Sequence, residues 1–92
     1  MIARLPNRFP ILVRELFVEL TLALVAGVRQ LRERRGLTQA ALAKRLGSSQ
    51  SRVAKMEAAD SSVSLDLMMR SLLSLGATVG EIARLIKKAE AA

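Results

Sequence analysis

The sequence contains no cysteine, no histidine, no tryptophan and no tyrosine. Without cysteine and histidine there are no disulfide bonds, no zinc sites built from these ligands, and no catalysis by a thiol or an imidazole. Paired carboxylates remain as a catalytic device, but the eight acidic residues are scattered, and Asp66 and Glu81 stand where helices are expected to begin. We therefore expect a protein that is not an enzyme and that requires no metal and no cofactor.

Aromatic residues and prolines are also few, with two phenylalanines and two prolines in 92 residues. Hydrophobic residues make up 51% of the chain, and many of them are leucine and alanine. These residues favour helices over strands, and the chain length suits one small core. The composition predicts an all-α protein whose helices pack on one another.

Long uncharged hydrophobic runs are missing as well. Residues 9–28 are rich in apolar side chains, but Arg14, Glu15 and Glu19 interrupt them, and the longest uncharged stretch within this segment is residues 20–28. A membrane-spanning helix needs about 20 mostly apolar residues. No persuasive cleavage site for a signal peptide is present either. We expect a cytoplasmic protein that does not insert into a membrane.

The most informative feature is a pair of short apolar stripes on either side of a glycine. Leu42 and Leu46 stand four residues apart, and Val53 and Met56 stand three apart, so each predicted helix has one narrow face to bury. Gly47 lies between them, where positive φ costs a glycine nothing and allows the first helix to end sharply. Two short helices joined by a tight turn are typical of a DNA-reading helix-turn-helix.

Positive charge is concentrated in the same part of the chain. The whole sequence has a formal net charge of +7, and residues 29–55 carry eight basic residues against one acidic residue, Glu33. All of the excess positive charge therefore lies on the segment with the DNA-reading pattern, as phosphate neutralisation requires. The alternative is a solvated basic helix surface, since basic runs such as residues 32–35 are common there.

Capping signals divide the chain into five predicted helices. The first covers residues 22–35, and it extends back toward residue 11 if the preceding apolar residues continue it. The predicted N-caps are Thr38, Ser49 and Ser64, the predicted helix ends are Gly36, Gly47 and Gly76, and Thr78 with Glu81 forms a capping box.

Apolar periodicity predicts the buried faces of the last two helices. These faces comprise Leu65, Met68, Met69, Leu72 and Leu73, followed by Val79, Ile82, Leu85, Ile86 and Ala89. The fifth helix has more apolar residues than one small core needs. We expect part of its stripe to face a second copy of the chain.

When Val53 and Met56 are turned inward, the third predicted helix presents its opposite face to solvent. Glutamine suits a bidentate contact with adenine, lysine suits guanine or phosphate, and alanine suits the thymine methyl group. The alternative is that residues 49–51 only cap the helix. The predicted base-reading residues are Gln50, Ser51, Ala54 and Lys55, and the predicted phosphate-binding residues are Gln39, Arg34, Arg35, Ser49 and Arg52.

The chain contains Arg-Gly-Leu-Thr-Gln at 35–39, Ala43, Leu46-Gly47, Ser49-Gln50-Ser51, Val53 and Met56-Glu57. With these elements, residues 29–86 resemble the Cro/Xre family of phage-type repressors. The resemblance implies a five-helix, lambda-repressor-like bundle with the helix-turn-helix at helices two and three. It also implies a phosphate contact by Gln39, base contacts by Gln50, Ser51 and Lys55, and an ion pair between Arg32 and Glu57. Ser48 departs from the pattern, because many members of the family carry an apolar residue there.

Residues 1–21 form a predicted N-terminal extension to a domain at residues 22–92. Between positions 11 and 18, apolar residues point to nearly every face of a helix, so we expect this segment to contact a second copy or a partner protein. Attachment to a membrane surface is a third hypothesis, which Glu15 and Glu19 oppose.

Two functional hypotheses follow. The first is a dimeric autorepressor that binds double-stranded DNA and reads a palindromic operator through successive major grooves. The second is an antitoxin, because residues 64–77 are similar to small HigA-type antitoxins, and the extension would then bind a toxin protein. A gene for a small basic toxin beside this one would favour the second hypothesis.

Overall fold

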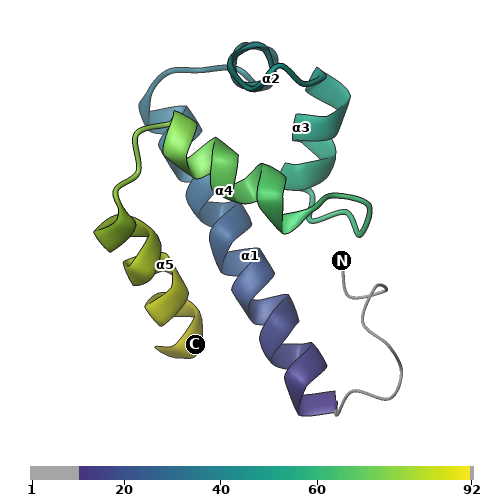
Figure 1. The fold of residues 1–92 in the computed structure, drawn as a ribbon, viewed down its shortest axis with the longest axis vertical. Helices are drawn as coiled ribbons and strands as arrows, with labels where there is room; N and C mark the ends of the chain where they lie inside the picture. Colours follow the sequence, from purple (N-terminus) through teal and green to yellow (C-terminus); the bar gives the residue numbers. More distant parts are fainter. Residues whose placement is uncertain (1–10, 92) are drawn as a thin grey trace.

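Five helices and no strand are present in the computed structural model, which describes residues 11–91 (Figure 1). This confirms the all-α prediction and the five-helix arrangement. Residues 1–10 of the predicted extension lie outside the described residues. The helices are α1 (Ile11–Arg34), α2 (Gln39–Leu46), α3 (Gln50–Glu57), α4 (Leu65–Ser74) and α5 (Val79–Ala91).

Helix α1 is continuous over 24 residues. Its sequence contains no proline and a single glycine, Gly27, so no residue forces a break. The helix therefore extends back to residue 11 and passes uninterrupted through positions 21 and 22, where the sequence predicts the extension to meet the domain. No helix in residues 11–91 is long and apolar enough to cross a membrane.

The predicted N-caps begin the three middle helices. In each case a hydroxyl oxygen accepts a hydrogen bond from the backbone N–H three residues later, which satisfies a donor that has no partner inside the helix. The bonds join Thr38 to Ala41 at 3.0 Å, Ser49 to Arg52 at 3.2 Å and Ser64 to Leu67 at 3.3 Å.

The predicted capping box is present at the start of α5. The Thr78 N–H donates to Glu81 Oε1 at 3.2 Å, and the Glu81 N–H donates to Thr78 Oγ1 at 3.1 Å. Hydrogen bonds from the Thr78 backbone and side chain hold the pKa of the Glu81 carboxyl below its ordinary value. The sequence pattern thus fixes where the last helix begins.

The predicted glycines end α1, α2 and α4 in the left-handed region, at Gly36, Gly47 and Gly76. Helix α3 ends in the same way without a glycine. Ala59 has a φ of 56°, the Asp60 N–H donates to the Lys55 carbonyl at 2.9 Å, and no glycine supplies the turn. An L-residue pays a steric cost in this conformation. The end of α3 is therefore strained.

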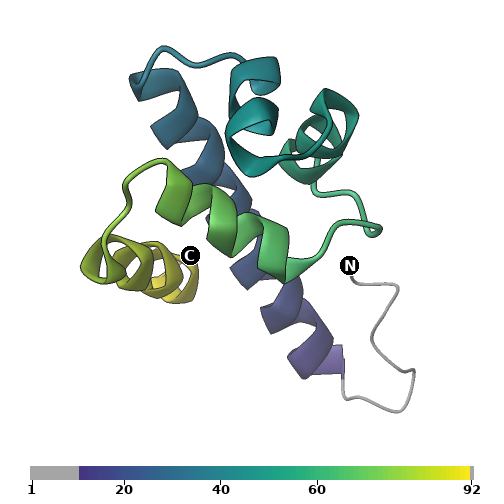
Figure 2. The same cartoon turned by 45° about the horizontal axis from the view of Figure 1, so that its top comes forward.

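Helix α1 is the axis of the molecule. It contacts α3, α4 and α5, while α2 contacts α3 and α4. Figure 2 shows α2 and α3 together on one side of α1 and α5 lying along another. The fully buried side chains at the centre include Leu24, Val28, Leu42, Val53, Met56, Leu67, Met68, Leu72 and Leu75.

The buried face of α4 differs from the predicted stripe. Leu65 and Leu73 are 43% and 56% exposed, so including them was wrong, and Leu67 and Ser71 are buried instead. The reason is that α4 packs against both α1 and α2. Two partners on neighbouring flanks turn the helix by about one position from the stripe that periodicity alone favours.

Helix α5 approaches α1 closely at Gly27. A Cβ atom on that glycine would lie 2.5 Å from Leu85 Cδ1, so the contact depends on the missing side chain. Ile82 is buried as predicted, whereas Val79 and Ile86 are 81% and 43% exposed. The helix thus buries one side and leaves part of its apolar stripe in solvent.

Candidate nucleic-acid interface

The turn between α2 and α3 has the geometry that its sequence predicts. Gly47 has a φ of 63°, and the Ser48 N–H donates to the Ala43 carbonyl at 2.9 Å. Ala43 is buried where the two helices meet, so its small side chain permits the close crossing. The apolar stripes also face inward, since Leu42, Val53 and Met56 are buried and Leu46 is half-buried.

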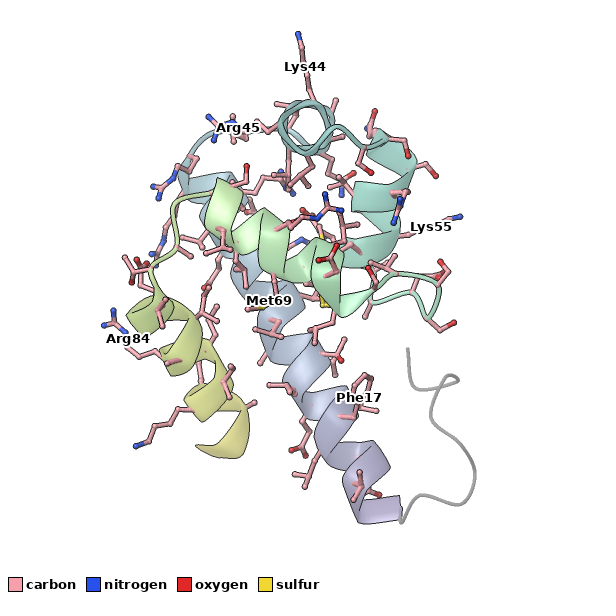
Figure 3. The ribbon with its side chains drawn as sticks, in the orientation of Figure 1. Phe17, Lys44, Arg45, Lys55, Met69 and Arg84 are labelled. Carbon is pink, nitrogen blue, oxygen red and sulfur yellow. The ribbon has the colours of Figure 1, made fainter. Side chains whose placement is uncertain are left out.

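The opposite face of α3 is open to solvent. Gln50 and Ser51 lie exposed in its first turn, and Lys55 is exposed one turn later. Ala54, between them, is half-buried. Figure 3 shows the Lys55 side chain pointing away from the molecule. The four predicted base-reading residues therefore share one accessible helix face with small side chains among them.

The outer surface of α2 and α3 carries positive charge only. Among residues 39–57, all of them described, the sole acidic residue is Glu57, whose side chain is 1% exposed. Lys44 extends away from α2 in Figure 3. A cationic surface without exposed carboxylates suits a polyanion such as the DNA backbone. Its exposed basic residues are Lys44, Arg45, Arg52 and Lys55.

Arg32 and Glu57 form the ion pair that the resemblance implies. Arg32 Nε lies 2.6 Å from Glu57 Oε2, and Arg32 Nη2 donates to Glu57 Oε1 at 2.9 Å. The third nitrogen, Nη1, donates to the Leu37 carbonyl at 2.7 Å. This two-pronged contact ties the last turn of α3 to α1 and to the loop before α2.

Two further donors converge on the same carboxylate. Gln39 Nε2 donates to Glu57 Oε1 at 3.2 Å, and Arg29 Nε lies 3.7 Å from that oxygen. Burial by itself raises the pKa of Glu57, but the hydrogen bonds from Arg32 and Gln39 outweigh it, and the pKa lies below its ordinary value of 4.5. Glu57 is therefore a buried carboxylate that its neighbours hold ionised.

The predicted phosphate-binding arginines at the end of α1 lie apart from the face of α3. Arg34 lines a groove between α1 and α5 that also includes Glu81 and Arg84. Arg35 Nε donates to the Leu75 carbonyl at 2.7 Å, at the end of α4. Arg52 and the N-cap Ser49 lie on α3 and at its start, beside the exposed face of this helix, whereas Arg34 and Arg35 do not.

Two residues that sequence reasoning did not select also take part in this region. Arg29 stands three positions before Arg32, a spacing that places both on one face of α1 and was available as a signal. Arg45 Nη1 donates to the Ser74 carbonyl at 3.3 Å, and no local pattern indicates that contact. Within residues 11–91, no three acidic side chains are grouped closely enough to hold a metal ion.

The turn contains one unsatisfied polar atom. Ser48 Oγ is buried and has no hydrogen-bond partner among the described residues. A buried hydroxyl without a partner costs free energy. The serine that departs from the apolar residue expected at this position therefore adds a free-energy cost at the turn.

The sequence model of the helix-turn-helix family matches residues 28–82, more than half of the chain. This segment begins in the second half of α1, contains α2, α3 and α4 entirely, and ends in the first turn of α5. No curated protein and no solved structure matches the chain.

Proposed function

Since this chain belongs to the Cro/Xre-type helix-turn-helix family and is thus a DNA-binding transcription regulator, we propose that it acts in the cytoplasm as a dimeric, sequence-specific repressor of its own operon. The observation that carries the proposal is the surface of α2 and α3. An exposed α3 face with Gln50 and Lys55 adjoins exposed cations, while the only carboxylate of these helices is buried. Base readout and phosphate attraction are thereby combined on one side of the molecule.

In the proposed complex, α3 enters the major groove and Gln50, Ser51, Ala54 and Lys55 meet base edges. Gln39 at the first turn of α2 and Arg52 beside the reading face contact phosphates. Helix N-termini contribute N–H groups that attract phosphate oxygens in the same region. The phosphate contacts predicted for Arg34, Arg35 and Ser49 stay predictions. Arg34 lines the groove between α1 and α5, the Arg35 guanidinium donates to the Leu75 carbonyl, and the Ser49 hydroxyl oxygen accepts the Arg52 N–H.

Dimerisation is proposed through the apolar side of α1 and α5. Leu16, Leu22 and Ile86 are 53%, 51% and 43% exposed. Leu22 lines a groove of about 350 Å³ together with Ala26 and Gly27, and Leu16 and Ile86 line a second hollow of about 200 Å³. A second copy would cover these side chains and place two α3 helices about 34 Å apart, in successive major grooves.

An antitoxin remains the second candidate function, because the exposed apolar side chains of α1 equally suit a toxin protein. Two single substitutions separate the hypotheses, Leu16→Lys in the first half of α1 and Ile86→Lys on α5. If either variant sediments as a monomer where the wild type is a dimer, the face joins two copies. If both stay dimeric and fail to bind the product of the neighbouring gene, the face binds a partner.

The experiment that tests the main proposal is DNA binding across a salt series. One duplex is the region just upstream of the gene and the other is its scrambled sequence at equal length. We expect a preference of about 1,000-fold or more for the native duplex and a steep salt dependence with both. Weak and equal binding to the two duplexes would contradict autorepression by the chain alone.

A further inference from the structure

Gln39 is held in place before any DNA is present. It is the first residue of α2 and is half-buried. Its Nε2 donates at 3.2 Å to Oε1 of Glu57, the last residue of α3. The acceptor is rigid as well, because Arg32 contacts both carboxylate oxygens and the Glu57 side chain is 1% exposed.

The geometry of a primary amide gives this contact a consequence. An amide nitrogen carries two hydrogens that lie in the plane of the group, about 120° apart. When one hydrogen is bound to a fixed carboxylate, the direction of the other is fixed too. The Gln39 side chain has then lost its rotamer freedom during folding rather than during binding.

We propose that Glu57 is a positioning residue for DNA binding, which acts by orienting the Gln39 amide so that its second N–H meets a backbone phosphate. The inference rests on the proposed function, because it requires the first turn of α2 to face DNA. It goes beyond the Arg32–Glu57 ion pair, because the second oxygen of Glu57 receives a role in recognition rather than in folding. The backbone N–H groups at the start of α2 lie beside the same phosphate position.

A double-mutant cycle between Gln39→Ala and Glu57→Gln tests the proposal. In Glu57→Gln an amide NH₂ group replaces one of the two carboxylate oxygens. Arg32 and Gln39 must then share a single oxygen, and the charged guanidinium is the stronger donor, so Gln39 loses its acceptor. Affinity is measured by fluorescence anisotropy with a random-sequence duplex at low salt, because a phosphate contact does not depend on sequence. We expect Gln39→Ala to weaken binding about tenfold, as the loss of a hydrogen bond to a charged group does.

Coupling between the two substitutions decides the outcome. We expect Glu57→Gln to weaken binding by about three- to tenfold in the wild-type background and by less than about twofold when Gln39 is already alanine. Equal factors in both backgrounds would overturn the proposal. Ser61→Ala is the control, because this exposed serine lies in the loop between α3 and α4, outside the groove proposed for dimerisation. It should leave affinity unchanged and should preserve the effect of Glu57→Gln.

A measurement on the wild-type chain covers the case in which Glu57→Gln does not fold. NMR of the ¹⁵N-labelled protein resolves the two Nε2 protons of Gln39, and the Gln39→Ala spectrum assigns them. We expect one proton to be shifted and protected without DNA, and the other to move when the duplex is added. Two unprotected, free-amide protons would overturn the proposal. A wild-type chain that does not bind duplex DNA at all would instead refute the proposed function.

Discussion

At the residue scale, the properties of this molecule depend on where individual polar atoms find partners. The same residue type has different roles at different positions. Ser49 and Ser64 cap helices through their hydroxyl oxygens, whereas Ser48 Oγ is buried without a partner among the described residues. Gln39 is bound to a buried carboxylate, whereas Gln50 is exposed. The proposed base recognition and the stability of the fold therefore depend on different side chains, which can be tested one at a time.

Gln50→Ala should remove base recognition while leaving nonspecific binding intact. We expect a loss of about 1 to 3 kcal/mol with the native upstream duplex and little change with scrambled DNA, because a bidentate contact with a base is sequence-dependent. Competition binding with the two duplexes measures the difference. Arg52→Ala, on the neighbouring surface, serves as the control and should weaken binding to both duplexes. Equal losses from Gln50→Ala with both DNAs would contradict base reading by this residue.

Ser48→Ala should stabilise the protein. Removing a buried hydroxyl that has no partner relieves a desolvation cost, and we expect a gain of about 1 kcal/mol in the free energy of unfolding. Urea denaturation measures it. The matched serine control is Ser64→Ala, which removes the N-cap of α4 and should destabilise by about 1 kcal/mol. A destabilised Ser48→Ala variant would show that this hydroxyl has a partner in solution.

At the scale of the element, each helix is delimited by local chemistry and oriented by its neighbours. Three glycines end α1, α2 and α4, and Ala59 takes the corresponding position after α3. Helix α3 presents the proposed base-reading face. The strain at Ala59 therefore lies just beyond the end of the helix that carries this face.

Ala59→Gly should relieve this strain. The left-handed conformation costs alanine about 1 to 2 kcal/mol, and glycine removes this cost. Glycine also destabilises the folded state by about 0.4 to 1 kcal/mol, because its unfolded chain has more conformational freedom. We expect a net stabilisation of about 0.5 to 1 kcal/mol in thermal or urea unfolding. Gly47→Ala is the reverse control, because no atom lies within 4 Å of the added Cβ position. Its cost should thus come from the backbone alone, and a stabilising Gly47→Ala would contradict the argument.

At the scale of the whole molecule, Glu57 joins three helices. Its carboxylate binds Arg32 of α1 and Gln39 of α2 from the last turn of α3. The apolar core holds the same helices together, but it does not fix the position of their polar side chains. The buried carboxylate therefore links the stability of the fold to the geometry of its proposed DNA surface.

Acid should destabilise the protein through this carboxylate. Because the pKa of Glu57 is lowered in the folded state, its stabilisation is complete above the ordinary value of 4.5 and is lost as pH falls through the folded pKa. Glu57→Gln should cost about 3 kcal/mol at neutral pH, since it leaves Arg32 without its charged partner, and should reduce the loss of stability on acidification. Urea unfolding at several pH values measures both effects.

The exposed Glu33 provides the control for the acid experiment. Its side chain is 62% exposed, and its ion pair with Arg29 spans 3.8 Å. Glu33→Gln should change the free energy of unfolding by less than about 0.5 kcal/mol and should keep the acid transition of the wild type. An unchanged acid transition in Glu57→Gln would contradict the role of Glu57 in that transition.

The sequence by itself determined the features that depend on neighbours along the chain. Capping residues, the turn glycine and the apolar spacing of Leu42, Val53 and Met56 identified the helices and the turn, because their interactions reach only three or four residues. Counting charges located the cationic segment for a similar reason, because basic residues that are close in the sequence stay close in space when they lie on the same short helices. The family resemblance supplied the Arg32–Glu57 pair, which spacing did not reveal.

Only the tertiary structure decided which neighbours distant residues meet. Periodicity assigned Leu65 and Leu73 to the core, but packing of α4 against two helices exposed them. The charge pattern predicted that Arg35 contacts DNA phosphates, but in the fold its guanidinium donates to the Leu75 carbonyl at the end of α4. The Gln39–Glu57 contact spans 18 positions. Such contacts depend on how helices cross, and crossing is set by the packing of the whole core rather than by any local pattern.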